Sequence, residues 1–224
     1  MSDDKAQAED DAIPKPPSAV IFFGADGVGK TTQARRLSEL YMKKGYRVKK
    51  CWLRARHSLS YLVSQILLKL GYLEVVRQGT REVLDSRRLP GKRLWSFLEF
   101  ISVLPWILTR MNLPLLLGYV VIADRYVVDT AVYNRYYIGE EFRIYERMLL
   151  RMKPKNALLI HLDADKDNLM ERRRGDWPED FIDYELGKYR TLASELQAIS
   201  INTSHRDMEE VGRIIVSACN IQDN

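Results

Sequence analysis

Eight residues near the start of the chain carry the clearest chemical signal. Residues 24–31 read GADGVGKT and match the pattern G-x-x-x-x-G-K-[ST]. In this pattern the glycines let the backbone curl around a polyphosphate, and Lys30 can reach its β and γ phosphates. The hydroxyl of Thr31 is a suitable ligand for Mg²⁺. The predicted nucleotide-binding residues are Gly24, Ala25, Asp26, Gly27, Val28, Gly29, Lys30, Thr31 and Thr32.

A second charged pair, Asp124 and Arg125, follows the apolar run 120–123. A carboxylate at the end of a buried strand can bind Mg²⁺ or its bound water, and the arginine after it can hold a second phosphate through two hydrogen bonds. Motor-type ATPases commonly have a water-activating carboxylate where this chain has Arg125. The structural alternative is a surface ion pair between these residues or their neighbours.

Three consecutive arginines form a third group, Arg172, Arg173 and Arg174. An arginine on a closing segment can stabilise the charge of a phosphoryl group in transfer, and Gly175 with Pro178 can let the segment move. A solvated helix end, capped by Gly175, is an equally good explanation.

Apolar runs and helical periodicity predict the elements that position these groups. Strands alternate with helices, which predicts an α/β fold with a parallel sheet covered by helices on both faces. Its ligand site lies beyond the carboxyl ends of the strands. We expect strands at 19–23, 47–53, 119–123, 157–162 and 198–202, helices at 34–45, 59–71, 92–109, 129–151, 165–173, 180–197 and 207–218, and a charged connector at 72–92.

Composition agrees with one folded domain. The chain has 224 residues, 46% hydrophobic and 29% charged, which excludes integral membrane, collagen-like and disulfide-scaffold classes. Residues 1–17 are acidic and proline-containing, and we expect a disordered tail before a domain at 18–224. Residues 1–18 carry five acidic and two basic side chains, so the remainder carries a net charge of +8, which suits a phosphate ligand or nucleic acid. The two distant cysteines, Cys51 and Cys219, indicate a reducing cytoplasm.

The most apolar region, 100–123, does not predict a membrane span. Arg110 and Asn112 interrupt it, and we expect Pro105 and Pro114 to break the helix. Neither uncharged piece reaches the length of about 20 residues that a bilayer requires. We expect a buried helix followed by a core strand.

Together these motifs resemble the thymidylate kinase family of P-loop nucleoside monophosphate kinases. The resemblance covers residues 19–215 and includes Asp124-Arg125-Tyr126 with Tyr133 downstream, and a lid-like stretch at about 171–180. It implies a three-layer P-loop NTPase fold, ATP and Mg²⁺ as cofactors, and a homodimer. By the same resemblance, Asp26 lies near the acceptor sugar and Arg125 holds the acceptor phosphate. The implied catalytic residues are Lys30, Asp124, Arg125, Arg172 and Arg174, the metal ligands Thr31 and Asp124, and the acceptor-binding residues Asp26, Arg54, Phe97, Arg125, Tyr126 and Tyr133.

Three departures from the family pattern fall on the acceptor side. The loop after the second strand, CWLRARHS at 51–58, is basic where the family has an acidic loop, so Arg54 and Arg56 can bind an anion or remain solvated. The long helix has Phe97 but no acceptor-binding arginine, and Phe97 can stack on a base or pack in the core. Asp129 replaces a serine and adds a negative charge beside the expected phosphate.

We therefore expect an ATP- and Mg²⁺-dependent nucleoside monophosphate kinase that acts on dTMP. A kinase of the same fold with another acceptor, such as a nucleoside or other small molecule, is the first alternative. A nucleic-acid-stimulated P-loop ATPase is the second, although the chain has no recognised nucleic-acid motif. The acceptor, the oligomeric state and the identity of the catalytic lid arginine stay open at this stage.

Overall fold

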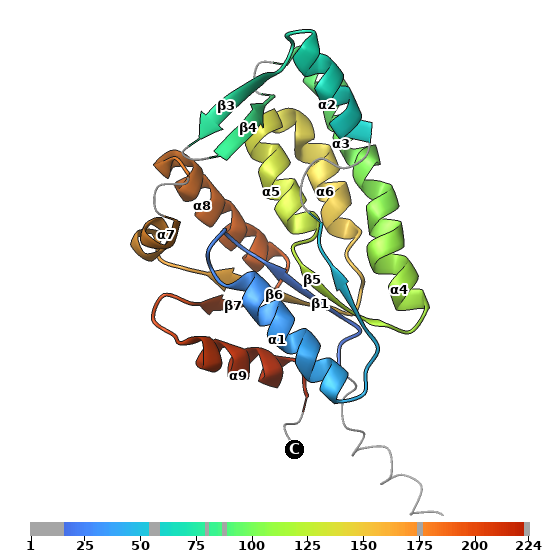
Figure 1. Ribbon diagram of the computed structural model, residues 1–224, viewed down its shortest axis with the longest axis vertical. Helices are drawn as coiled ribbons and strands as arrows, with labels where there is room; N and C mark the ends of the chain where they lie inside the picture. Colours follow the sequence, from blue (N-terminus) through green and yellow to red (C-terminus); the bar gives the residue numbers. More distant parts are fainter. Residues whose placement is uncertain (1–15, 54–58, 79–80, 87–88, 174–176, 222–224) are drawn as a thin grey trace, which may run out of the picture.

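A computed structural model describes residues 16–53, 59–78, 81–86, 89–173 and 177–221 (Figure 1). Its centre is a parallel sheet in the order β2-β5-β1-β6-β7. Helices surround this sheet, so the predicted α/β fold is confirmed. The strands of the sheet are β1 (Ala19–Phe23), β2 (Val48–Cys51), β5 (Val120–Asp124), β6 (Ala157–Asp163) and β7 (Ile199–Asn202).

The middle strand β1 is completely buried, which explains its uninterrupted apolar sequence. Ala19 is in register with Val121 of β5 on one side and with Ala157 of β6 on the other. Because all these strands run in the same direction, their carboxyl ends meet at one edge of the sheet. The loop between β1 and α1 leaves β1 at that edge, and Asp124 ends β5 there.

The helices follow the predicted alternation closely. α1 and α9 lie side by side (Figure 1), whereas α5 packs against both α6 and α8. The helices are α1 (Lys30–Lys43), α2 (Leu59–Lys69), α3 (Lys92–Ile107), α4 (Leu113–Leu116), α5 (Val127–Ile138), α6 (Arg143–Arg151), α7 (Lys166–Arg173), α8 (Glu179–Glu195) and α9 (Met208–Ala218).

For two segments the predicted secondary structure is wrong. The expected connector 72–92 contains an antiparallel hairpin of β3 (Glu74–Gln78) and β4 (Arg81–Asp85), located with α2 at the upper end of the molecule in Figure 1. The expected helix 129–151 is divided into α5 and α6, because Gly139 adopts a φ of 95° and a short 3-10 turn follows it.

The predicted helix break at Pro105 and Pro114 is also wrong. A π-helical turn (Leu108–Asn112) joins α3 to α4, and its wider hydrogen-bonding pattern accommodates the second proline. The resulting stretch Lys92–Leu116 is, by length and composition, the one helix in the described part of the chain that could cross a bilayer. In the most apolar 18 residues of this helix, 44% of the residues are buried inside the protein. Core helices of soluble proteins are often as long and as apolar, so the length and composition of this helix are weak evidence for a membrane span.

His161 on β6 is buried close to Gly24, near the carboxyl edge of the sheet. Its ring stacks on Phe23 with centroids 5.2 Å apart, and its Nδ1 lies 3.1 Å from the hydroxyl of Ser200. Burial chiefly, helped by the positive charges of Arg190 and Lys30 and opposed by Asp163, lowers the pKa of His161 from 6.5 to about 4. The folded protein therefore holds this imidazole neutral.

We expect folding stability to fall as the pH is lowered from about 6.5 to about 4. In that range the unfolded chain binds a proton at His161 that the folded chain excludes, a loss of up to about 3 kcal/mol. Urea unfolding at about pH 7.5 and about pH 4 measures this loss. His161→Gln, which retains a hydrogen-bonding side chain but does not titrate, should show a smaller difference between the two pH values. An equal difference in both proteins would contradict this assignment.

Candidate functional site

The loop between β1 and α1 is held close to the sheet by its own glycine and lysine. Gly24 has a φ of 136°, and a Cβ there would collide with the carbonyl oxygen of Leu162 on β6, so no other residue fits. Lys30 is buried, and its Nζ donates to the carbonyl oxygens of Gly24 at 2.7 Å and Ala25 at 2.6 Å. The lysine predicted to contact phosphate therefore stabilises the loop itself in this structure.

Thr31 and Asp124, predicted as metal ligands, are brought together from α1 and β5. The Thr31 hydroxyl donates to Asp124 Oδ2 at 2.6 Å. The other carboxylate oxygen of Asp124 is buried and has no hydrogen-bond partner among the residues that the structure describes. A hydroxyl and a carboxylate with an unsatisfied buried oxygen fit Mg²⁺, which prefers oxygen ligands and retains several of its waters.

Arg125 lies between two carboxylates. Its backbone adopts a φ of 79°, which is strained for a side chain other than glycine and occurs mostly at functional sites. Its guanidinium forms ion pairs with Asp26 of the loop between β1 and α1 and, at 3.1 Å, with Asp129 in the first turn of α5. This buried pairing differs from the surface ion pair considered from the sequence.

Asp129 is itself firmly held. Besides Arg125, it accepts a hydrogen bond from the backbone N–H of Tyr126 at 3.2 Å and one from the hydroxyl of Tyr189 at 2.9 Å. Burial first, and then the charge of Asp129, raises the pKa of Tyr189, which therefore remains a donor. The residue that departs from the family pattern is thus an integral part of the site.

The arginines at the end of α7 point to different partners. Arg172 donates to the backbone carbonyl of Thr203 at 2.9 Å and to its hydroxyl at 3.1 Å, next to β7. Arg173, which we did not predict as a site residue, donates from Nε to the carbonyl of Asp26 at 2.7 Å and pairs with Glu185 on α8 at 2.7 Å. Arg174 lies outside the described residues.

The predicted acceptor-binding residues are brought together only in part. Tyr126 is buried at the start of α5, next to Arg125, and Tyr133 lies further along the same helix, its ring 4.5 Å from that of Tyr137. Phe97 lies on α3, half-exposed, with its ring 6.3 Å from Tyr145 on α6. Arg54 is outside the described part of the chain.

Two polar residues on α5 were missed from the sequence. Thr130 and Asn134 are spaced four residues apart and share one face of α5, whereas Tyr126 precedes the helix as its N-cap with extended backbone. Each of the three is buried with a polar side-chain atom, Oη of Tyr126, Oγ1 of Thr130 and Nδ2 of Asn134, that has no hydrogen-bond partner among the described residues. Buried polar groups are normally satisfied, so these three atoms are candidates for contact with a further polar group.

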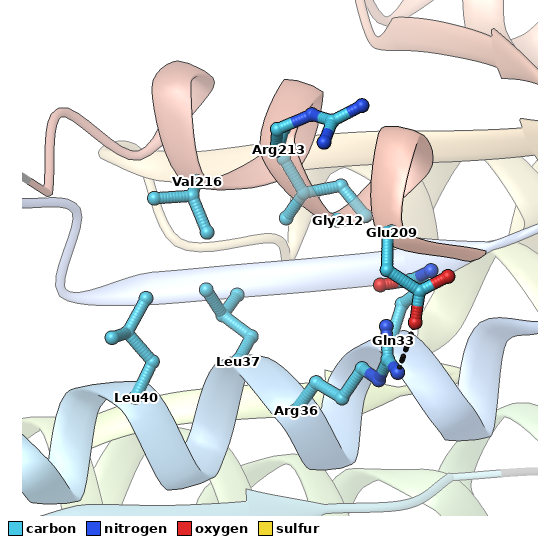
Figure 2. Close-up of a pocket in the computed structure, with 9 residues that line it drawn as sticks. Gln33, Arg36, Leu37, Leu40, Glu209, Gly212, Arg213 and Val216 are labelled. Carbon is cyan, nitrogen blue, oxygen red and sulfur yellow. Dashed lines mark hydrogen bonds and ion pairs between the residues drawn. The ribbon is translucent and has the colours of Figure 1, made fainter. Parts of the chain in front are cut away.

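A cavity of about 360 Å³ lies apart from these residues, between α1 and α9. Figure 2 shows Leu37 and Leu40 of α1 facing Val216 of α9, with Arg36 and Glu209 paired at 2.8 Å. None of the predicted site residues lines it, so we assign it no part in the chemistry.

The site as a whole has two halves at one edge of the sheet. The loop around Lys30, with Thr31 and Asp124, is suited to a polyphosphate and a metal ion, while Arg125 can hold a second anion beside it. Such an arrangement can transfer a phosphoryl group between two bound molecules by positioning and charge neutralisation.

Comparison with known proteins agrees with this chemistry. A protein of Archaeoglobus fulgidus described as "Probable thymidylate kinase" is 30% identical over 216 residues, which cover 92% of this chain and 98% of that protein. No family model matches the chain.

Proposed function

Because the chain belongs to the thymidylate kinase family, we propose that this nucleotide kinase uses ATP and Mg²⁺ to phosphorylate a nucleoside monophosphate, with dTMP as the expected acceptor. The observation that carries the proposal is the meeting of Lys30, the Thr31–Asp124 pair and Arg125 at one edge of the sheet. The proposal extends to the whole unit 18–224 as one kinase domain, with residues 171–180 as its lid.

The donor half of the site uses the loop and α1. On nucleotide binding Lys30 exchanges its two carbonyl contacts for phosphate oxygens, and backbone N–H groups at the start of α1 bind the anion. Thr31 and Asp124 would hold the metal ion, which would supply positive charge against the phosphates of the nucleotide. From the lid, Arg172 and Arg174 are proposed to approach the ATP phosphates.

The acceptor half uses Arg125, Asp26 and the polar face of α5. Arg125 holds the acceptor phosphate, and Asp26 accepts a hydrogen bond from the sugar. An acceptor phosphate is already a nucleophile, so no strong general base is needed, and catalysis depends on alignment. Tyr126, Thr130 and Asn134 offer hydrogen bonds to the remainder of the acceptor. Arg54, Phe97 and Tyr133 stay predictions of this half-site.

One observation favours a second candidate, the same transfer to a less charged acceptor such as a nucleoside. Arg125 is already paired with two carboxylates, and Asp129 keeps its place through Tyr126 and Tyr189. A phosphate dianion bound at Arg125 would be repelled by the two carboxylates, whereas an uncharged hydroxyl would not.

We expect a panel of nucleosides and mononucleotides, incubated with ATP and Mg²⁺, to yield most product with dTMP. Chromatography measures the amount of phosphorylated product formed from each acceptor. Lys30→Ala is the control, because it removes the cation at the transferring group and should abolish turnover while the protein stays folded. Product from nucleosides alone would support the second candidate, and turnover in folded Lys30→Ala would overturn the assignment of the loop.

We expect Arg125→Ala to lower kcat/KM for the acceptor roughly ten- to more than a hundredfold, with a smaller change in KM for ATP. The physical reason is the loss of a charge-assisted contact to the acceptor while the donor is held by the loop. Steady-state kinetics with each substrate varied in turn provides the measurement.

Arg135→Ala is the matched control for this variant. Arg135 lies on the same helix and pairs with Glu146 at 2.8 Å and Glu140 at 2.6 Å, away from the loop. Its removal should lower the melting temperature without changing acceptor kinetics. If Arg125→Ala behaves in the same way, Arg125 has only a structural role.

We also propose a second copy of the chain as a partner. Large apolar side chains are exposed on neighbouring helices, among them Leu62 of α2, Leu94 of α3, Leu116 of α4 and Ile144 of α6. Exposed apolar surface of this kind usually marks an interface. Light scattering should give a dimer mass, and Leu94→Glu, on the exposed face of α3, should shift it towards the monomer.

A further inference from the structure

Helix α8 contacts both halves of the site through two side chains one turn apart. Glu185 and Tyr189 are both buried, although Glu, when unpaired, is rarely found inside a protein. Glu185 Oε2 accepts from Arg173 Nη2 at 2.7 Å, and the Tyr189 hydroxyl donates to Asp129 Oδ1 at 2.9 Å. One contact leads towards the phosphate-binding loop and the other towards Arg125.

The two contacts are joined through Asp26. Its backbone carbonyl accepts from Arg173 Nε at 2.7 Å, while its carboxylate pairs with Arg125. Arg125 in turn pairs with Asp129 at 3.1 Å. The contacts therefore form a closed ring, which runs through Glu185, Arg173, Asp26, Arg125, Asp129 and Tyr189 and returns to α8.

The ring contains three carboxylates and two guanidinium groups, which are largely shielded from solvent. The side chains of Arg173, Glu185 and Asp129 are exposed by 4%, 6% and 2%, so none of them can exchange its partner for water without cost. The aromatic side chain of Tyr189 is further held by packing, because its centroid lies 6.2 Å from that of Phe23 at the end of β1. A change at any member must therefore be taken up by its neighbours in the ring.

Asp26 is the member of the ring that belongs to the loop between β1 and α1. Lys30 donates to the carbonyl oxygens of Gly24 and Ala25, and Arg173 donates to that of Asp26. The carbonyl of Asp26 is held by Arg173 and its carboxylate by Arg125. A shift of the Asp26 backbone therefore changes the geometry at both arginines.

We propose that Glu185 and Tyr189 are positioning residues that close this ring, so that the loop and Arg125 change geometry together. Neither touches a substrate, and each acts through the residue that it holds. The inference rests on the proposed function in one respect, namely that the loop binds a nucleoside triphosphate. It is independent of the identity of the acceptor.

The test uses a non-hydrolysable ATP analogue with Mg²⁺ and no acceptor. Tyr189→Phe keeps the aromatic contact with Phe23 and removes only the hydroxyl that donates to Asp129, so it can weaken analogue binding only through the ring of contacts. We expect Glu185→Gln and Tyr189→Phe each to raise the Kd about three- to thirtyfold. The Kd of the Glu185→Gln, Tyr189→Phe double variant should be close to the higher of the two single-variant values. The reason is that the first substitution already interrupts the ring of contacts, so the second removes little further coupling.

Tyr184→Phe is the matched control on the same helix. It removes the same hydroxyl group, which there donates to the carbonyl of Val132 at 3.3 Å and is not part of the ring. Its Kd should stay within about twofold of the wild type, and its effect should simply multiply with that of Glu185→Gln. A wild-type Kd in Tyr189→Phe, or multiplying losses in the Glu185→Gln, Tyr189→Phe double variant, would overturn the proposal.

Urea unfolding of the same variants tests the ring of contacts separately from the proposed nucleotide binding. If the wild type does not bind the analogue, the proposed function fails, and the ring is then judged by stability alone. A ring predicts that the losses in unfolding free energy from Glu185→Gln and Tyr189→Phe are not additive, whereas those from Glu185→Gln and Tyr184→Phe are. Additive losses in both pairs would overturn the ring.

Discussion

A site that holds phosphate must bury positive charge, and buried positive charge must be paired when no phosphate is bound. The architecture at the carboxyl edge of the sheet follows from this constraint. Lys30 is satisfied by two loop carbonyls, Arg173 by a third carbonyl and Glu185, and Arg125 by Asp26 and Asp129. Each of these three buried cations is thus kept in place by groups of the protein itself.

The two parts of this edge are stabilised in different ways. The loop between β1 and α1 relies on backbone geometry around Gly24, which the parallel register of β1 and β6 fixes. Beside Arg125, Asp129 accepts a hydrogen bond from Tyr189 of α8. The geometry of the loop therefore depends on the sheet, whereas the geometry around Arg125 depends on how α8 packs.

The sequence predicted those features that depend on short stretches of chain. The buried strand β1, the glycine-rich loop and the helix after it are local features of this kind. The pairing of Arg125 with Asp129 was not predicted, because Asp129 was considered only as a negative charge beside the expected phosphate. The hairpin at Glu74–Asp85 was missed because its strands are short and charged, and helical periodicity continued across Gly139 although the backbone turns there. The pairing of Arg173 with Glu185 and of Tyr189 with Asp129 depends on how α8 packs against α5 and β6, which no local pattern records.

The position of β1 in the middle of the sheet has a consequence for how the chain acquires its structure. Ala19 finds its partners at Val121 and Ala157, more than a hundred residues later in synthesis. Strand β1 leaves the ribosome before β5 and β6, so its hydrogen bonds form only after those strands have emerged. Such non-local parallel pairing slows folding and leaves an apolar strand exposed meanwhile.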